Sequence, residues 1–266
     1  MANGSSSSGA TKAGASQGLG NSGGGGGGGN IKVGKIPAKK NPFKPFKEYQ
    51  TEFAKAKDAQ SLVKVLEDNG VAISDKFVKY IQSGKYPIES AKAFLKGNLL
   101  TISHYGDGER FIGFGAYKDS RSPTVAFYSH PTITGTQGNG YVAVNIGHPS
   151  SRTGSIYGTG AHEGYHHVTA VIADAKNTSM YTYANDVVKS SYSSWSKKTG
   201  LSSGDIKKDF TTHVSAYGAT KDSEALSESM KNVIMKKGKA SSLSKTVFNQ
   251  VRKDAKTYKT GKHKAP

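Results

Sequence analysis

Apolar residues recur at helical spacing where the folded part of the chain begins. The pattern starts near Tyr49 and stops at Asn69-Gly70, a dipeptide typical of a helix C-terminus. Its apolar members are Phe53, Leu62, Val63, Val65 and Leu66. Two shorter helices are expected at residues 74–81 and 87–95, so residues 48–104 are predicted to form a helical N-terminal subregion.

Three segments after this subregion combine β-branched and aromatic residues between Gly, Pro, Asn and Ser, which is typical of strands. They cover residues 111–117, 124–128 and 141–146. A small sheet, mixed or antiparallel, is the simplest arrangement of these short segments.

Helical periodicity returns after the strands. The expected helices cover residues 158–176, 177–198, 223–237 and, with a strongly basic composition, 244–258. The second of them is amphipathic and ends at Thr199-Gly200. This order predicts an α+β fold in which the sheet packs on the 158–176 helix and a helical C-terminal part follows.

Composition adds tails at both ends of this pattern. The chain has 266 residues, among them 33 glycines and no cysteine. Gly, Ser, Lys and Pro dominate residues 1–47, which are therefore expected to be a disordered tail, and residues 239–266 are expected to be a basic tail. Without cysteine, the chain can form neither disulfides nor thiolate metal sites, so any metal must be held by His, Asp or Glu.

The formal net charge of +18 favours anionic partners, and the basic ends could contact DNA or acidic proteins. A lysine-rich, solvated surface is the simpler interpretation of the same charge. The start of the chain has no basic segment followed by an apolar one, so no signal peptide is predicted. No apolar run approaches the roughly 18 residues of a membrane helix, and no membrane partner is expected.

The segment from His162 to His166 reads H-E-x-x-H inside the expected 158–176 helix. Residues four apart on a helix face the same way, so both imidazoles can bind one metal ion. Zn²⁺ is typical of this pattern, and Glu163 is then placed to accept a proton from the activated water.

A catalytic zinc site needs a third protein ligand. Glu224 and Glu228 stand four apart on the expected 223–237 helix. Glu224 is the natural third ligand, and Glu228 can accept the outer N–H of a ligand histidine. Taken alone, the two glutamates would also suit a solvated helix face.

H-E-x-x-H followed by E-x-x-x-E on a later helix resembles the gluzincin metallopeptidases, which have the zincin fold. The segment Ser-Ala-Tyr-Gly at residues 215–218, together with Glu224 and Glu228, looks like the lethal-factor-type peptidases. Similar domains occur in minor head and structural proteins of tailed bacteriophages. The resemblance covers roughly residues 105–238 and implies a zincin-like metallopeptidase domain there.

The resemblance also implies roles for single residues. Tyr217, seven residues before Glu224, would point into the site and stabilise the oxyanion or assist the leaving amine. An edge strand upstream of the metal helix commonly aligns the substrate peptide in zincins by β-augmentation. The residues assigned to that strand are Tyr141, Val142, Ala143 and Val144, with an internal strand as the alternative. The family usually has Gly directly before the second histidine, whereas this chain has Gly164-Tyr165.

The remaining histidines are given no part in metal binding. His167 lies on a different helical face from the two ligands and is expected to pack or to line the cleft. The others are interpreted as structural, surface or unassigned residues: His104, His130, His148 and His213.

The resulting prediction is a zinc metalloendopeptidase of phage or prophage origin, acting on a protein or peptide substrate in a virion or the host cytoplasm. The alternative is a minor virion protein that keeps the zincin fold without proteolysis. Its basic tails would contact DNA or capsid proteins. A dedicated nucleic-acid-binding protein would explain only the charge.

Overall fold

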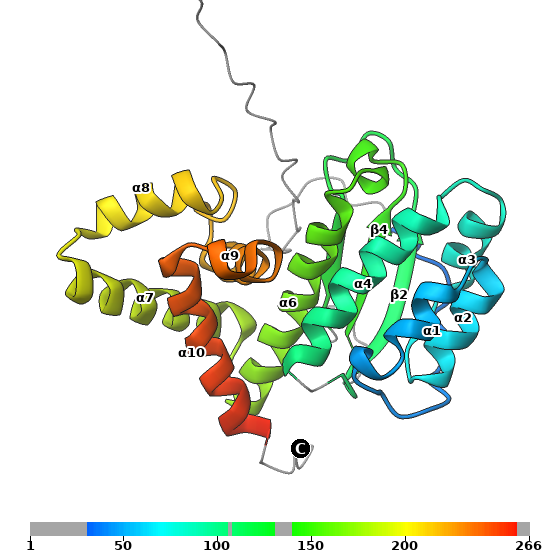
Figure 1. The fold of residues 1–266 in the computed structure, drawn as a ribbon, viewed down its shortest axis with the longest axis horizontal. Coiled ribbons are helices and arrows are strands. Elements are labelled where there is room, and N and C mark those ends of the chain that lie inside the picture. The colour runs from blue at the N-terminus through cyan, green and yellow to red at the C-terminus, as the bar shows by residue number, and fades with distance from the viewer. Residues whose placement is uncertain (1–30, 106–107, 131–139, 260–266) are drawn as a thin grey trace, which may run out of the picture.

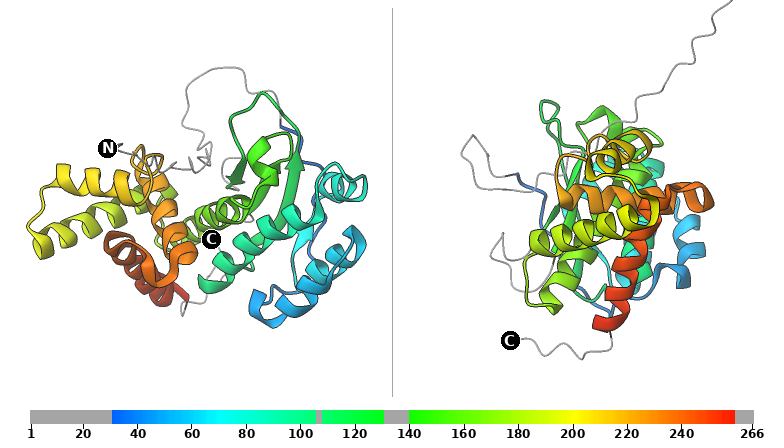
Figure 2. Two further views of the ribbon diagram at one scale, coloured as in Figure 1. Left: turned by 45° about the horizontal axis from the view of Figure 1, so that its top comes forward. Right: turned by 90° about the vertical axis from the view of Figure 1, so that its left-hand side faces the viewer.

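The structure is a computed structural model, and it describes residues 31–105, 108–130 and 140–259. A long central helix, α6 (Ile156–Ala175), separates two parts of the molecule (Figure 1). A small sheet with helices α1 to α4 lies on one side, and helices α7 to α10 lie on the other. The left view of Figure 2 shows the same division. The mixed α+β class that the order of elements predicts is confirmed.

The first part, called the sheet half below, contains four helices and four strands within the described ranges. Its helices are α1 (Gln50–Lys55), α2 (Ala59–Asp68), α3 (Asp75–Gln82) and α4 (Ile88–Tyr105). Its strands are β1 (Ala72–Ile73), β2 (Phe111–Tyr117), β3 (Ala126–Ser129) and β4 (Gly140–Asn145). Short 3-10 helices lie at Phe46–Glu48 and Pro149–Arg152. Within the helical pattern that ends at residue 69, Asp58 caps a separate α2 through a reciprocal box with Ser61.

The strands form one mixed sheet in the order β1-β2-β4-β3. Strands β1, β2 and β4 run parallel to one another, whereas β3 runs antiparallel to β4 with Ala126 opposite Val144. Five of the six residues of β4 are buried, which explains its almost continuous apolar sequence. The core of the sheet half includes Phe94, Phe114 and Val142, each fully buried.

Helices α4 and α6 pack unusually closely because glycines face each other across the contact. A methyl group at Gly160 would overlap the carbonyl oxygen of Phe94, and one at Gly97 would overlap that of Tyr157. A methyl group at Gly164 would lie 3.0 Å from the carbonyl oxygen of Asn98. The absent side chains therefore fix the position of α6 on the sheet half.

The second part, called the helical half below, is built from four helices. They are α7 (Met180–Thr199), α8 (Ser203–His213), α9 (Asp222–Lys236) and α10 (Ser242–Lys259), with a 3-10 turn at Lys237–Lys239. Their core holds Tyr165 and Ile172 of α6 together with Phe210, Leu226 and Val247. The left-handed Gly200 ends α7, as the sequence predicts.

Helix α8 is not among the elements that the sequence predicts. It is short and polar, and only Ile206 and Phe210 of its residues are buried. The sequence feature that could have predicted α8 is its N-terminus, where Ser202 and Asp205 form a capping box. Two apolar residues four apart are too few for a periodic pattern to identify a helix.

Both expected tails contribute to the fold in their described parts. The expected disorder of residues 31–47 is wrong, because Phe46 is fully buried and the carbonyl oxygen of Val33 accepts from the Ala116 N–H. Apolar residues spaced among the lysines and prolines explain this packing. Residues 1–30 and 260–266 lie outside the described residues.

The C-terminal helix belongs to the core of the helical half and is more than a basic tail. Residues on one face of α10 recur every four positions and are buried, whereas Lys253 and Lys256 are exposed. The buried residues are Leu243, Val247, Val251 and Ala255. None of the helices in the described ranges combines the length and apolar composition that a membrane crossing needs.

Candidate metal centre

Helix α6 carries the H-E-x-x-H motif in its buried middle. Almost every residue of α6 from position 156 to position 173 is buried, because the sheet half covers one side of the helix and the helical half covers the other. His162 and Glu163 have no exposed surface, and His166 is 6% exposed. The helix therefore presents two imidazoles and one carboxylate to an interior lined by protein.

Helix α9 brings two carboxylates to the same place. It lies beside α6 (Figures 1 and 2), and it starts at Asp222, so Glu224 stands in its first turn. The Glu224 Oε2 atom is 3.0 Å from His162 Nε2 and 3.6 Å from His166 Nε2. The two Nε2 atoms are 3.1 Å apart. The three residues expected to be metal ligands thus converge, and together they could hold a metal ion.

The close contact of Glu224 with His162 is not a well-aligned hydrogen bond. The Oε2 atom of Glu224 is buried, and it has no hydrogen-bond partner of acceptable geometry among the described residues. The three candidate ligand atoms therefore converge, with the two Nε2 atoms in hydrogen-bond contact with each other. A metal ion between them would satisfy all three.

The outer nitrogens of the two histidines have different partners. The Nδ1 atom of His162 lies 2.7 Å from the Glu228 carboxylate, to which it donates its proton. The Nδ1 atom of His166 lies 3.3 Å from the hydroxyl of Ser227. Glu228 therefore occupies the position that the sequence predicts, whereas nothing in the sequence pattern identifies Ser227. A donated Nδ1–H leaves the Nε2 atom of His162 as the ligand atom.

The charges of His162, Glu224 and Glu228 shift one another's pKa values. Burial lowers the pKa of His162, but Glu224 and Glu228 outweigh it and raise that pKa to about 10. Burial raises the pKa of Glu224, but the neighbouring His166 and His162 hold it well below its usual range. Burial also raises the pKa of Glu228, but its hydrogen bond with His162 and the charges of His162 and Lys231 lower it to about 2. Without metal, the cluster therefore holds a proton that a metal ion has to displace.

Glu163 differs from the other two glutamates. Both of its carboxylate oxygens are buried and have no hydrogen-bond partner among the described residues. Burial raises its pKa, while the charges of His162 and His166 act in the opposite direction. A carboxylate with a raised pKa beside a candidate metal centre is suited to accepting and returning a proton.

Tyr217 lies close to the cluster, as expected. It stands in the turn before α9, and its ring centroid is 6.1 Å from that of His162. The turn itself is tightly packed, because a methyl group at Gly218 would come within 3.0 Å of the Glu228 Cβ atom. The position of Tyr217 is thus tied to the same helix that supplies the third ligand.

The expected substrate strand is in the wrong place in the sheet. Residues 141–144 belong to β4, which pairs with β2 on one side and with β3 on the other. Their backbone groups are used within the sheet and cannot also bind a peptide. Among the described residues, the edge position next to α6 belongs to β3 instead. Strand order depends on long-range pairing, so the sequence leaves the choice of edge strand open.

A second polar cluster, at the other end of α6, has no counterpart among the predicted sites. Asp174 accepts from Arg110 at 2.6 Å, and it lies 3.5 Å from the Nε2 atom of His130. His167 is buried beside the ring of Phe111 and its Nδ1 atom is 3.3 Å from the Tyr128 hydroxyl. These contacts join β3 to α6, which supports a structural role for His130 and His167.

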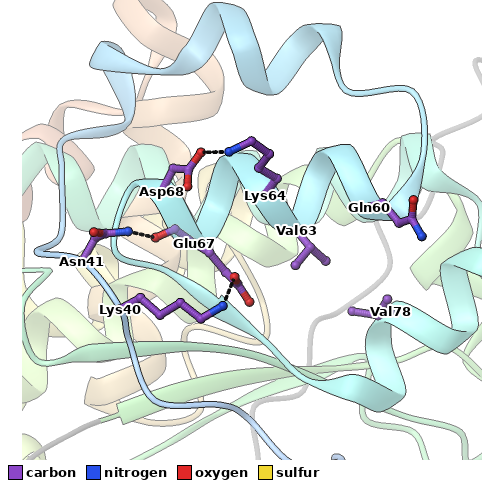
Figure 3. A pocket seen from close by; sticks show the side chains of 8 residues that line it. All are labelled: Lys40, Asn41, Gln60, Val63, Lys64, Glu67, Asp68 and Val78. Atoms are coloured by element: carbon purple, nitrogen blue, oxygen red, sulfur yellow. Dashed lines mark hydrogen bonds and ion pairs between the residues drawn. The ribbon is translucent and has the colours of Figure 1, made fainter.

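A surface hollow in the sheet half is also lined by charged side chains, but these form ion pairs with one another. A hollow of about 390 Å³ lies between α2 and residues 40–41 (Figure 3). Lys40 pairs with Glu67 and Lys64 pairs with Asp68, each at 2.7 Å. Its charges are therefore already matched, whereas in the cluster on α6 and α9 the buried Oε2 atom of Glu224 has no hydrogen-bond partner among the described residues.

Comparisons of the chain with protein-family models, with curated protein sequences and with solved structures find no match. The geometry of the residues is therefore the basis for any functional conclusion.

Proposed function

We propose that this protein is a zinc-dependent metallopeptidase with a zincin-type site. The observation that carries the proposal is the convergence of His162, His166 and Glu224 on one buried point, with Glu163 beside it. Two ligands would come from one helix and the third from another, and Glu163, without a hydrogen-bond partner among the described residues, would act as the catalytic base. This arrangement is that of catalytic zinc sites with three protein ligands.

The spacing of the three ligand atoms supports zinc. Ligand atoms at about 2.0–2.1 Å from a tetrahedral ion lie roughly 3.3 Å from one another. The separations here are 3.0, 3.1 and 3.6 Å, which bracket that value. A set of two imidazoles and one carboxylate also suits zinc better than Ca²⁺ or Mg²⁺, which prefer oxygen ligands.

The residues around the site can carry peptide-bond hydrolysis. Zinc supplies a Lewis acid that activates water and polarises the scissile carbonyl group. The Glu163 carboxylate accepts the proton of the attacking water and returns it to the departing nitrogen. Tyr217 donates its hydroxyl to the developing oxyanion. The protein walls on both sides of α6 keep these groups away from bulk water, where their interactions would be weaker.

Strand β3 is the strand along which a peptide substrate would lie. It is the edge strand beside α6 among the described residues. A peptide added to this edge would run past the catalytic base. Strand β3 thus takes the substrate-binding role that the sequence suggested for residues 141–144.

Zinc content is the first test of the proposal. Purified wild-type protein is expected to hold about one zinc per chain, since three ligands converge on one point. His162→Ala is expected to lose the ion, and His213→Ala is the matched control because that histidine is exposed and pairs with Asp209. Wild-type protein without zinc after refolding with the metal would overturn the proposal.

Cleavage of unfolded protein substrates is the second test. Glu163→Gln should keep the zinc and lose hydrolysis, because the amide cannot accept the proton of the attacking water. If wild-type protein and Glu163→Gln hold zinc but are equally inert, the alternative of a metal-holding virion protein without proteolysis is favoured.

A further inference from the structure

The outer Nδ1 atoms of the two candidate ligand histidines have different hydrogen-bond partners. His166 has the neutral hydroxyl of Ser227 at its outer nitrogen, 3.3 Å away. His162 has a carboxylate there, and this carboxylate has a cationic partner of its own. The Nζ atom of Lys231 is 3.0 Å from Glu228 Oε1 and 3.2 Å from Oε2. A chain of contacts therefore runs from Lys231 through Glu228 to His162.

Lys231 is built into this position. It stands three residues after Glu228 on α9, so the two side chains meet on one face of the helix. The lysine side chain is 24% exposed and the glutamate side chain 7%. A methyl group at Gly158 would come within 3.2 Å of the Lys231 Cε atom, so the glycine leaves room for the lysine stem to lie against α6.

We infer that Lys231 is a positioning residue for the metal centre, an inference that rests on the zinc site proposed above. The polar contacts of Lys231 with other described residues are with Glu228 and not with a candidate ligand atom. Lys231 contacts both oxygens of Glu228 and thereby fixes the oxygen that receives the Nδ1–H of His162. His162 is held in one ring orientation and one tautomer, with Nε2 directed at the metal point.

The charge of Lys231 matters as well as its position. Glu228 is a buried carboxylate, and without the counter-charge of Lys231 it can turn towards water. That movement would take the acceptor away from His162 and free its ring. Serine at the corresponding place behind His166 carries no charge and needs no such partner, so the dependence on lysine is specific to His162.

The test compares zinc affinity, measured by competition with a chromophoric chelator. Outer partners of ligand histidines typically change metal affinity by 10–100-fold, so Lys231→Met is expected to weaken zinc binding about tenfold. Lys231→Arg should restore most of the affinity, because it keeps the charge. Lys236→Met is the matched control, since it removes an exposed lysine from the same helix, and it should leave the affinity unchanged within about twofold.

Repeating the Lys231→Met substitution in Glu228→Gln protein separates an effect on the position of Glu228 from a general packing effect. In Glu228→Gln protein the charge that Lys231 binds is gone, so adding Lys231→Met should change the zinc affinity by less than about twofold. Visible absorption of Co²⁺ in the site is the independent readout. The spectrum should change in Lys231→Met and return in Lys231→Arg, because it reports ligand geometry directly.

Two outcomes would overturn the inference: wild-type affinity in Lys231→Met, or the same loss in the Glu228→Gln background as in wild type. An equal loss in Lys236→Met would also overturn it, because the effect would then be one of net charge. If Lys231→Met does not fold, the single variant Glu228→Gln decides: unchanged affinity and cobalt spectrum would rule out control through this carboxylate. Absence of zinc from wild-type protein would instead count against the proposed function.

Discussion

The sheet half and the helical half contribute differently to the site between them. The sheet half has the larger aromatic and aliphatic core, and it fixes the backbone of α6 through the glycines that face α4. The helical half holds α6 through bulky side chains such as Tyr165 and Ile172, and it supplies Glu224 and Glu228. One half therefore sets where the histidines stand, and the other completes the ligand set only if it docks on α6.

The order Gly164-Tyr165, unusual beside the zincin pattern, follows from this division. Gly164 faces α4, where a methyl group would already be 3.0 Å from the Asn98 carbonyl oxygen. Tyr165 points the other way and is fully buried in the core of the helical half. Neighbouring positions on one helix thus serve opposite halves. The candidate metal centre thus lies at a joint between the two halves.

The largest expected effect comes from separating α6 from the sheet half. Gly160→Val would force a branched side chain into the Phe94 carbonyl group, and backbone atoms cannot turn aside as a flexible side chain can. The cost should exceed the usual overpacking range of about 1–3 kcal/mol, and cooperative unfolding in urea should be lost. The matched control is Gly204→Ala on exposed α8, expected to stabilise by no more than about 1 kcal/mol. Cooperative, near-wild-type unfolding of Gly160→Val would show that α4 and α6 need not approach so closely.

Metal removal should break the joint without changing any residue. Free zinc at a thousand times its Kd stabilises a native state that binds it by about 4 kcal/mol, and a chelator removes that contribution. Thermal unfolding with and without the chelator measures the difference. Hydrogen exchange should then show α9 losing more protection than α2, because only α9 shares the ion with α6. Equal losses in both helices would contradict a joint located at the metal centre.

A pair of leucine variants sharpens the comparison of the two cores. Leu226 on α9 and Leu62 on α2 are both fully buried, so each change to alanine should cost about 2–5 kcal/mol. Only Leu226→Ala should also weaken zinc binding, because it loosens the helix that carries Glu224 and Glu228. Urea unfolding and chelator competition measure the two quantities. A similar affinity loss in Leu62→Ala would mean that global stability alone controls metal binding.

The smallest effects concern two carboxylates on α6 whose pKa values shift in opposite directions. Burial raises the pKa of Glu163 above its ordinary 4.5, so its ionised form destabilises the metal-free protein above that pH. Glu163→Gln should therefore be more stable than wild type at pH 7. The advantage should disappear as the pH falls below 4.5, where the unfolded chain also binds the proton.

Asp174 should show the opposite sign. Burial acts to raise its pKa, but His130 and Arg110 outweigh it and lower that pKa below 3.8. Its stabilisation is present above pH 3.8 and is lost as the pH falls through the lowered value. Asp174→Asn should thus lose about 1 kcal/mol at pH 7, and the loss should fade in acid. Urea unfolding with a chelator across this pH range measures both variants, and equal signs would contradict the assigned causes.

Local periodicity by itself determines much of the site. A helical turn places His162 and His166 on one face whatever lies around them, and the same holds for Glu224 and Glu228. The lack of cysteine limits the ligands to these residue types. The signal for Lys231 is also local, three residues after Glu228, but it gains meaning only because Glu228 faces His162.

Only the tertiary structure decides which groups meet across the chain. The order β1-β2-β4-β3 moves the edge position to β3, and α8 forms from two buried residues and a capping box. Ser227 contacts His166 across 61 residues of sequence, and no sequence motif predicts this contact. Helix and strand periods follow from the geometry of neighbouring residues, whereas these contacts depend on how whole elements dock, which no short window of sequence contains.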